Sequence, residues 1–144
     1  MTRQILPAVA AAIFNEKGQV LLQKRKDVDQ WCIISGHVEF GETIENAILR
    51  EVAEETNTTG RIKRFIGVYS EPPHQVYTYE DRQVQYVTSY FEVILNEPID
   101  TNFSNNETGA LCFFDTESLP ENFARINPYW LEDAQSEDAR CFVR

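Results

Sequence analysis

The sequence has few of the residues that bind soft metals or form covalent cross-links. It contains three cysteines, Cys32, Cys112 and Cys141, with no Cys-x-x-Cys pair, and only two histidines, His37 and His74. An odd number of widely spaced cysteines suits neither a disulfide framework nor a zinc site. We therefore predict reduced structural thiols and exclude a zinc-binding or disulfide-rich fold.

Long apolar runs are also absent. No stretch approaches the roughly 20 apolar residues that cross a bilayer. The N-terminal segment MTRQILPAVAAAIF is apolar, but Asn15 and Glu16 follow it and no clear cleavage site is present, so we predict a strand and not a signal peptide. These features predict no membrane partner and a cytoplasmic location.

Positive charge is scarce as well. The chain has 13 basic and 23 acidic residues and a formal charge of −10. This charge disfavours nucleic-acid polymers and anionic membranes as partners, but a small nucleotide remains possible because a bound metal ion reverses the local sign. The 144 residues, of which 42% are hydrophobic, suit a single domain that spans residues 1–144.

The sequence does contain one strongly acidic stretch, Gly36 to Thr58, with six glutamates among 23 residues. Its second half predicts a helix from about Thr43 to Thr56. Thr43 is a suitable N-cap, and Asn57 is a residue type that tolerates the left-handed conformation at a helix end. We therefore expect this helix to position the acidic side chains.

Three glutamates of the predicted helix fall on or beside its apolar stripe. At about 100° per residue, Glu51 and Glu55 lie within the stripe and Glu54 lies just beside it. Arg50 can pair with Glu54 at i+4, but one guanidinium cannot neutralise three repelling carboxylates. Oxygen ligands of this kind suit Mg²⁺, for which Mn²⁺ can substitute. The stripe consists of Ile44, Ala47, Ile48 and Val52.

The same stretch resembles the Nudix box, G-x5-E-x7-R-E-U-x-E-E-x-G-U, in which U is a bulky aliphatic residue. Asn57 and Thr58 depart from the last two positions of the pattern, and neither change removes a charged group. Asn commonly replaces Gly in a left-handed cap, so the first change is structurally mild. The positions in register are Gly36, Glu42, Arg50, Glu51, Val52, Glu54 and Glu55.

The resemblance implies an α+β fold, an α/β/α sandwich with a mixed β-sheet and the Nudix loop-helix. It also implies a pyrophosphohydrolase in which Arg50 orients a glutamate. Glu107, at the end of a polar connection, is the candidate for a further glutamate that joins the metal site or activates water, although it equally suits a plain loop carboxylate. The general base stays open between Glu51 and Glu107. The implied metal ligands are Glu51, Glu54 and Glu55, with the Gly36 carbonyl and a peripheral Glu42.

The remaining segments predict a sheet around this helix. Residues 7–14 and 19–24 read as a β-hairpin, residues 60–69 and 111–114 as strands, and residues 83–95 as a central strand with two apolar faces. Residues 97–106 predict a polar connection beside the site. Asn127 and Pro128 predict the start of a closing helix that ends near Ala134.

Three residues are candidates for substrate binding. Residues 70–82 predict a loop whose Tyr77 and Tyr79 could stack on a base, although such tyrosines are also common without a ligand. Arg25, in the run Lys24 to Lys26, could contact a phosphate or could simply be a solvated strand end. Each of these side chains therefore has a functional and a structural interpretation.

The substrate class follows from the resemblance. Pro73 lies fifteen residues beyond Thr58, as in the ADP-ribose-cleaving branch of the family, which slightly favours ADP-ribose or another linked nucleoside diphosphate over a nucleoside triphosphate. The alternative is a catalytically silent nucleotide sensor or interaction module with the same fold. The charge of −10 speaks against capped RNA, and a homodimer is possible.

Overall fold

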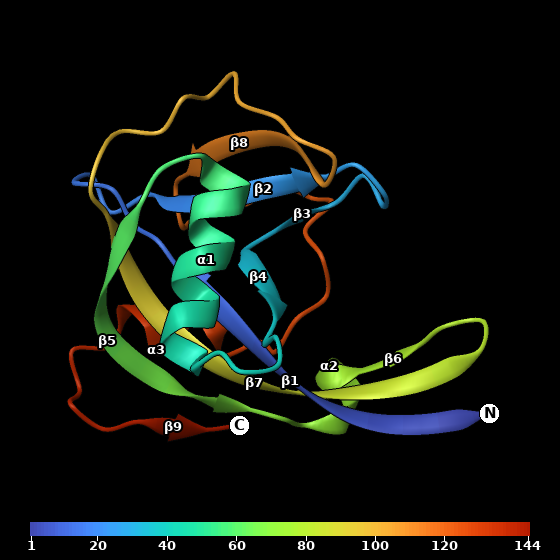
Figure 1. Cartoon of the computed structure of the whole chain (residues 1–144). Coiled ribbons are helices and arrows are strands. Elements are labelled where there is room, and N and C mark those ends of the chain that lie inside the picture. The colour runs from blue at the N-terminus through green and yellow to red at the C-terminus, as the bar shows by residue number, and fades with distance from the viewer.

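A computed structural model describes residues 1–144, which form two β-sheets and three helices (Figure 1). The larger sheet has the strand order β4-β1-β7-β5-β9, with β6 paired to β7. Its strands are β1 (Thr2–Ala12), β4 (Ile34–His37), β5 (Gly60–Tyr69), β6 (Val76–Thr78), β7 (Arg82–Leu95) and β9 (Phe142–Val143). The smaller sheet has the order β3-β2-β8, from β2 (Val20–Arg25), β3 (Trp31–Cys32) and β8 (Thr108–Phe114).

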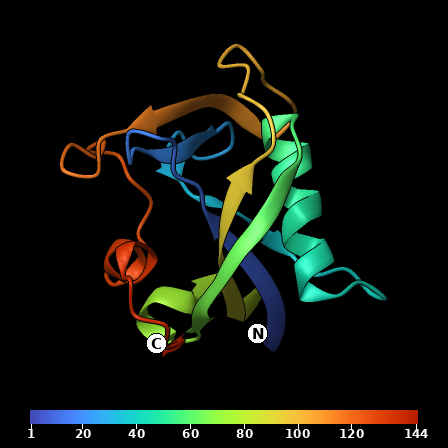
Figure 2. The ribbon, with the colours of Figure 1, turned by 90° about the vertical axis from the view of Figure 1, so that its left-hand side faces the viewer.

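The larger sheet is mixed and has helices on both sides. β1 runs parallel to β7 and β5 parallel to β9, whereas the other pairs are antiparallel. Figure 2 shows α1 (Ile44–Thr56) on one side of these strands and α3 (Trp130–Gln135) on the other; α2 (Pro72–Gln75) is a single short turn. This arrangement confirms the predicted α+β sandwich with a mixed sheet. No helix is long and apolar enough to cross a membrane.

Alternate residues of β1 divide the core between the two helices, because successive side chains of a strand point to opposite faces. Val9 and Ala11 belong to the cluster that contains Ile48 and Val52 of α1. Ala10 and Ala12 belong to a second cluster that contains Trp130 and Ala134 of α3. One apolar strand therefore fixes the sheet between the two helices.

The helix that carries the acidic stretch forms as predicted. Thr43 is its N-cap and accepts a hydrogen bond from the Asn46 backbone N–H at 3.1 Å. Asn57 follows the helix with φ of 55°, in the left-handed region. Glu51 and Glu55 are buried on the side of the apolar stripe, and Glu54 is exposed. The helical spacing therefore determines which carboxylates point inward.

The predicted hairpin is wrong beyond its turn. β1 and β2 belong to different sheets and meet only where Phe14 bridges Val20, next to a 2.8 Å hydrogen bond from the Leu21 N–H to the Ile13 carbonyl. Over Ala8–Ala11, β1 pairs with β4 on one edge and β7 on the other, so no edge remains for β2. β2 instead pairs with β3 and β8.

The predictions for residues 70–82 and for the closing helix need correction, whereas the prediction of a central strand is confirmed. Residues 70–82 are not a simple loop, since α2 and β6 form there and β6 pairs with β7. The closing helix begins at Trp130 and not at Asn127, whose side chain instead accepts a hydrogen bond from the Tyr129 N–H at 2.9 Å. β7 lies between β1 and β5, as predicted for residues 83–95.

Candidate metal centre

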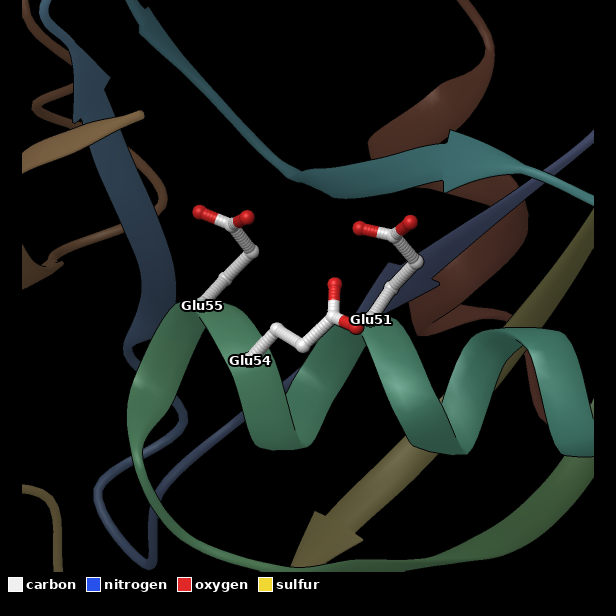
Figure 3. A group of neighbouring side chains, drawn as sticks. All are labelled: Glu51, Glu54 and Glu55. Carbon is white, nitrogen blue, oxygen red and sulfur yellow. The ribbon is translucent and has the colours of Figure 1, made fainter. Parts of the chain in front are cut away.

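Three glutamates of α1 form a compact acidic cluster (Figure 3). One carboxylate oxygen from each of Glu51, Glu54 and Glu55 lies within 4.8 Å of the others. Figure 3 shows Glu51 and Glu55 projecting from the helix in the same direction, with the carboxylate of Glu54 turned toward Glu51. The cluster arises because residues three and four apart share a helix face.

Gly36 allows the helix to approach the sheet. It lies on β4, paired with Val9, on the face that α1 covers. A Cβ atom at Gly36 would lie 2.1 Å from the Glu51 Cδ and 2.2 Å from its Oε1, far inside van der Waals contact. Glycine is therefore required here so that the Glu51 carboxylate can lie against the β4 backbone.

Arg50 holds the loop and the helix together. Its guanidinium donates two hydrogen bonds to Glu42, at 2.9 and 2.8 Å, one to Glu51 at 2.9 Å and one to the His37 carbonyl at 2.9 Å. The predicted i, i+4 pair with Glu54 is present at 3.3 Å. These bonds from Arg50 lower the pKa of Glu42 to about 2. Both Glu42 oxygens face Arg50, and Glu42 does not belong to the three-glutamate cluster.

Glu107 lies beside the cluster although it comes from a distant loop. The pKa of Glu55 is raised to about 7, chiefly by burial; the neighbouring Glu107 carboxylate adds to this shift, whereas a hydrogen bond from Thr108 opposes it. Burial also raises the pKa of Glu51, and its hydrogen bond from Arg50 opposes this shift. The sequence-predicted glutamates are thus brought together, with the exception of Glu42.

The cluster has more negative charge than the protein compensates. Arg50 is the one cation bonded to Glu51 and Glu54, and it also forms the bidentate pair with Glu42. Glu55 has no salt-bridge partner although it is 3% exposed. Several convergent carboxylate oxygens with a deficit of cations are the donor set that a hard divalent ion such as Mg²⁺ prefers. The residues present therefore fit a divalent cation.

Two of the predicted substrate residues, Arg25 and Tyr77, interact electrostatically with Cys32 of β3. Arg25 forms a bidentate pair with Asp27, at 3.1 and 2.8 Å, at the end of β2. The pKa of the Cys32 thiol is raised to about 11, chiefly by burial. The positive charge of Arg25 opposes this shift, and the negative charge of Glu55 adds to it. Burial raises the pKa of Tyr77, and the charges of Cys32 and Arg25 act on it as well. Arg25, Tyr77 and Glu55 thus each interact electrostatically with Cys32.

Tyr79 belongs to an aromatic group centred on Tyr86. Its hydroxyl lies 3.1 Å from that of Tyr86, and Arg82 stacks over its ring at 5.1 Å. Tyr86 stacks in turn on His37, with ring centroids 5.3 Å apart, and His37 directly follows Gly36 on β4. Tyr77 meets Tyr86 edge to face at 5.6 Å. The two tyrosines therefore share one partner, Tyr86, which the sequence did not single out.

Further residues at the site were missed by the sequence analysis. Asn105 accepts hydrogen bonds from the backbone N–H groups of Glu107 and Thr108, at 2.8 and 2.6 Å, and donates one to the Glu54 carbonyl at 2.9 Å. Gln23 and Thr108 lie behind Glu55. The available signal for Gln23 was a polar residue that directly follows the apolar run Val20 to Leu22, but its partner could not be identified from that pattern.

Comparison with known proteins gives a consistent family assignment. The sequence model of the family described as NUDIX domain matches residues 5–134. The chain is 44% identical over 63 residues to a Bacillus subtilis (strain 168) protein provisionally named an 8-oxo-dGTP diphosphatase, a match that covers 44% of this chain and 42% of that protein. It is 41% identical over 70 residues to the ADP-ribose pyrophosphatase of Methanocaldococcus jannaschii, covering 46% and 41% respectively.

A solved structure extends the likeness over almost the whole chain. The ADP-ribose pyrophosphatase from Streptococcus suis 89-1591 matches with a TM-score of 0.72 and 22% sequence identity, covering 96% of this chain and 98% of that one. At this identity the likeness concerns the fold. The chain spans about two fifths of the length of the curated relatives it matches.

Proposed function

The chain belongs to the NUDIX domain family, and we propose that it is a divalent-metal-dependent hydrolase that cleaves a diphosphate linkage in a small nucleotide. The observation that carries this proposal is the group of convergent carboxylates Glu51, Glu54 and Glu55, with Glu107 beside them and too little positive charge to neutralise them. We further propose that residues 1–144 act as one domain, because β1 contributes to the core on both faces of the sheet.

In this proposal, Glu51, Glu54 and Glu55 hold the ion, together with the Gly36 carbonyl. When bound, a Mg²⁺ or Mn²⁺ ion neutralises phosphate oxygens and lowers the pKa of an attacking water. Arg50 keeps Glu51 in orientation through its 2.9 Å hydrogen bond. Glu42, which we expected to be a peripheral ligand, contributes chiefly by fixing Arg50 through two hydrogen bonds.

The general base is Glu51 or Glu107, and the contacts favour Glu107. Glu51 already accepts a 2.9 Å hydrogen bond from Arg50 and, in this proposal, also binds the ion, so its oxygens are occupied. Glu107 comes from a loop that Asn105 fastens to α1, so its carboxylate is held next to Glu55 without a guanidinium partner. Glu107 is therefore our first choice to accept the proton of water.

The proposed substrate is a nucleoside diphosphate linked to another group, such as ADP-ribose, ahead of a nucleoside triphosphate. Tyr77 offers an aromatic face for the base and Arg25 a positive charge for a phosphate, and the two side chains act on each other electrostatically. Pro73 in α2 and the name of the Methanocaldococcus jannaschii relative support ADP-ribose, whereas the Bacillus subtilis relative supports a triphosphate. Tyr79 contributes to base binding through Tyr86.

The experiment is a turnover assay with ADP-ribose, nucleotide sugars, dinucleoside polyphosphates and nucleoside triphosphates, first with Mg²⁺ and then with Mn²⁺. Glu51→Gln removes one charged ligand, and Glu45→Gln is the matched control because Glu45 is exposed in the first turn of the same helix. We expect turnover of one substrate class by the wild type and the control, and loss of turnover in Glu51→Gln.

Two outcomes would redirect the proposal. Wild-type turnover by Glu51→Gln would remove the cluster from the mechanism. If the wild type hydrolyses none of the substrates but a nucleotide raises its melting temperature, the nucleotide-sensor alternative is favoured. No box carboxylate is missing from the sequence, so we place the hydrolase first.

A further inference from the structure

Two buried polar side chains of the smaller sheet, Thr108 and Gln23, form a hydrogen-bonded group with Glu55. The Thr108 hydroxyl, at the start of β8, donates a hydrogen bond to the Oε2 atom of Glu55 and lies 2.8 Å from the Oε1 atom of Gln23 on β2. The three side chains are 0%, 3% and 5% exposed for Thr108, Glu55 and Gln23. This contact links the smaller sheet to the carboxylate cluster.

The fold uses a strand irregularity to bring Thr108 to this position. Gln23 pairs with Leu111, and Arg25 pairs with Thr108, because the register shifts between Lys24 and Arg25. In a regular strand, residues three apart such as Thr108 and Leu111 point to opposite faces. The extra residue of the bulge returns Thr108 to the face of Leu111 and Gln23, which is the face that meets α1.

The loop before β8 is fastened to α1 at the same point. Asn105 accepts hydrogen bonds from the backbone of Glu107 and Thr108 and donates to the Glu54 carbonyl. Gln23 is held in turn by a 3.4 Å hydrogen bond from its Nε2 atom to the Ile33 carbonyl. The hydroxyl of Thr108 is thus fixed from β2 on one side and from α1 on the other.

The chemistry at Thr108 is specific to a hydroxyl. Valine has almost the same shape and suits a buried strand equally well, whereas a buried hydroxyl is unfavourable unless it forms hydrogen bonds. The hydroxyl has one hydrogen, so it can donate to Glu55 or to Gln23 at any moment, and a carboxylate is the stronger acceptor. Donation to the Oε2 atom fixes the side-chain rotamer of Glu55 and leaves the Oε1 atom without this hydroxyl partner.

We propose that Thr108 is a positioning residue, supported by Gln23, that fixes the carboxylate of Glu55 in the orientation required to bind the divalent ion. This inference rests on the proposed function, since it assigns to Glu55 the role of a metal ligand. Residues that hydrogen-bond to metal ligands from behind typically change metal affinity by about 10- to 100-fold when they are lost. Thr108 acts on the ion only through Glu55.

The test measures Mn²⁺ affinity by calorimetry or by electron paramagnetic resonance in the absence of nucleotide. Thr108→Val should weaken Mn²⁺ binding by roughly 10- to 100-fold, and Thr108→Ser, which keeps the hydroxyl, should remain within about threefold of the wild type. Thr88→Val is the matched control, because Thr88 lies on β7 of the other sheet and its hydroxyl accepts a hydrogen bond from Gln75 of α2. At saturating Mn²⁺, the KM for nucleotide should change little in Thr108→Val.

A purely structural role would give a different result. Thr108→Val would then lower the melting temperature while Mn²⁺ affinity stayed at the wild-type value, and the proposal would be overturned. If Thr108→Val does not fold, Gln23→Leu provides the measurement, with an expected loss of Mn²⁺ affinity of about three- to tenfold; unchanged affinity in that variant also overturns the proposal.

The two proposals fail in distinguishable ways. A wild type that binds Mn²⁺ but hydrolyses no nucleotide contradicts the proposed function, and the affinity series still decides the role of Thr108. A wild type that binds no Mn²⁺ contradicts both. Wild-type-like Mn²⁺ affinity in Thr108→Ser, together with weakened Mn²⁺ affinity in Thr108→Val, would identify the hydroxyl itself as the group that holds Glu55.

Discussion

The protein buries carboxylates in two regions, around α3 and on α1, which differ in how far cations pair with these carboxylates. On α3, Asp133 is 1% exposed and accepts two hydrogen bonds from Arg144, at 3.0 and 2.8 Å, and one from the Tyr69 hydroxyl. Nearby, Glu92 on β7 pairs with Arg64 at 3.0 Å and with Lys63 at 3.4 Å. These acids have their cations within the fold.

The carboxylates of α1 lack such partners. Glu55 is as deeply buried as Asp133, but its hydrogen-bond donor is a threonine hydroxyl and it has no salt bridge. Glu51 shares Arg50 with Glu42 and Glu54. A buried carboxylate is unfavourable unless it is paired and hydrogen-bonded. Burial of an acid is therefore no sign of function by itself; the absent cation distinguishes the α1 region from the α3 region.

The strongest way to break this comparison is Glu55→Gln. The change removes one charge from the cluster and should lower turnover by roughly 1,000-fold, since metal stabilisation of the transition state is worth several kcal/mol. Glu55 has no cationic partner, so its replacement leaves no buried cation unpaired. The melting temperature of the ion-free variant should therefore equal or exceed that of the wild type. Turnover assays and thermal unfolding in EDTA measure both effects, and a large loss of stability would mean that Glu55 is a structural acid like Asp133.

The reciprocal change is Asp133→Asn. It leaves Arg144 without its bidentate partner, so the free energy of unfolding should fall by about 2–3 kcal/mol, or roughly 5–10 °C in melting temperature. Turnover measured well below that temperature should stay within about twofold of the wild type, because Asp133 lies on α3 and outside the acidic cluster. Denaturant unfolding and turnover assays test this, and a loss of turnover greater than tenfold would contradict the separation of the two regions.

A smaller effect is expected when the approach of the helix to the sheet is disturbed. Gly36→Ala places a methyl group where the Glu51 carboxylate lies, since the added Cβ would be 2.1 Å from its Cδ. Glu51 must move, and we expect Mn²⁺ affinity to fall by about tenfold or more, with a stability loss of about 1–3 kcal/mol from overpacking. Ser35→Ala, an exposed neighbour on β4, is the control. Unchanged Mn²⁺ affinity in Gly36→Ala would show that the position of Glu51 is not critical.

The α1 region could be predicted from the sequence because its geometry is local. Residues three and four apart share a helix face, so the burial of Glu51 and Glu55 and the pair of Arg50 with Glu54 follow from spacing. The spacing also predicted that Glu54 points toward the protein, which is wrong, because Glu54 is exposed. The left-handed Asn57 follows from its residue type. The position of Glu107 required the family resemblance, since it lies 52 residues beyond Glu55 in the sequence.

The other features depend on contacts that no local pattern encodes. Tyr69 and Asp133 are 64 positions apart, and Thr108 and Gln23 are 85 apart, so their pairing depends on the sheet order. The predicted hairpin failed for the same reason, because β4 and β7 compete for the edges of β1. Sequence spacing identified the acids that need a cation, but not the residues that hold those acids in place.

The last prediction concerns the pH dependence of stability, to which the α1 region contributes through Glu55. Burial raises the pKa of Glu55 from an ordinary value of 4.5 to about 7 in the ion-free protein. Below pH 4.5 the folded and unfolded chains both keep this proton. Between pH 4.5 and 7 the unfolded chain releases it while the folded chain retains it, so this group makes the folded state less stable as the pH rises through that window.

Melting temperatures in EDTA at pH 5 and pH 7.5 measure this contribution. Glu55→Gln should reduce the difference between the two values, because the amide does not titrate, whereas Asp133→Asn should keep the wild-type difference at a lower absolute melting temperature. Identical pH dependence in the wild type and in Glu55→Gln would contradict the raised pKa. Saturating Mg²⁺ should reverse the trend for the wild type, because the ion requires the ionised carboxylate and therefore stabilises the fold more as the pH rises.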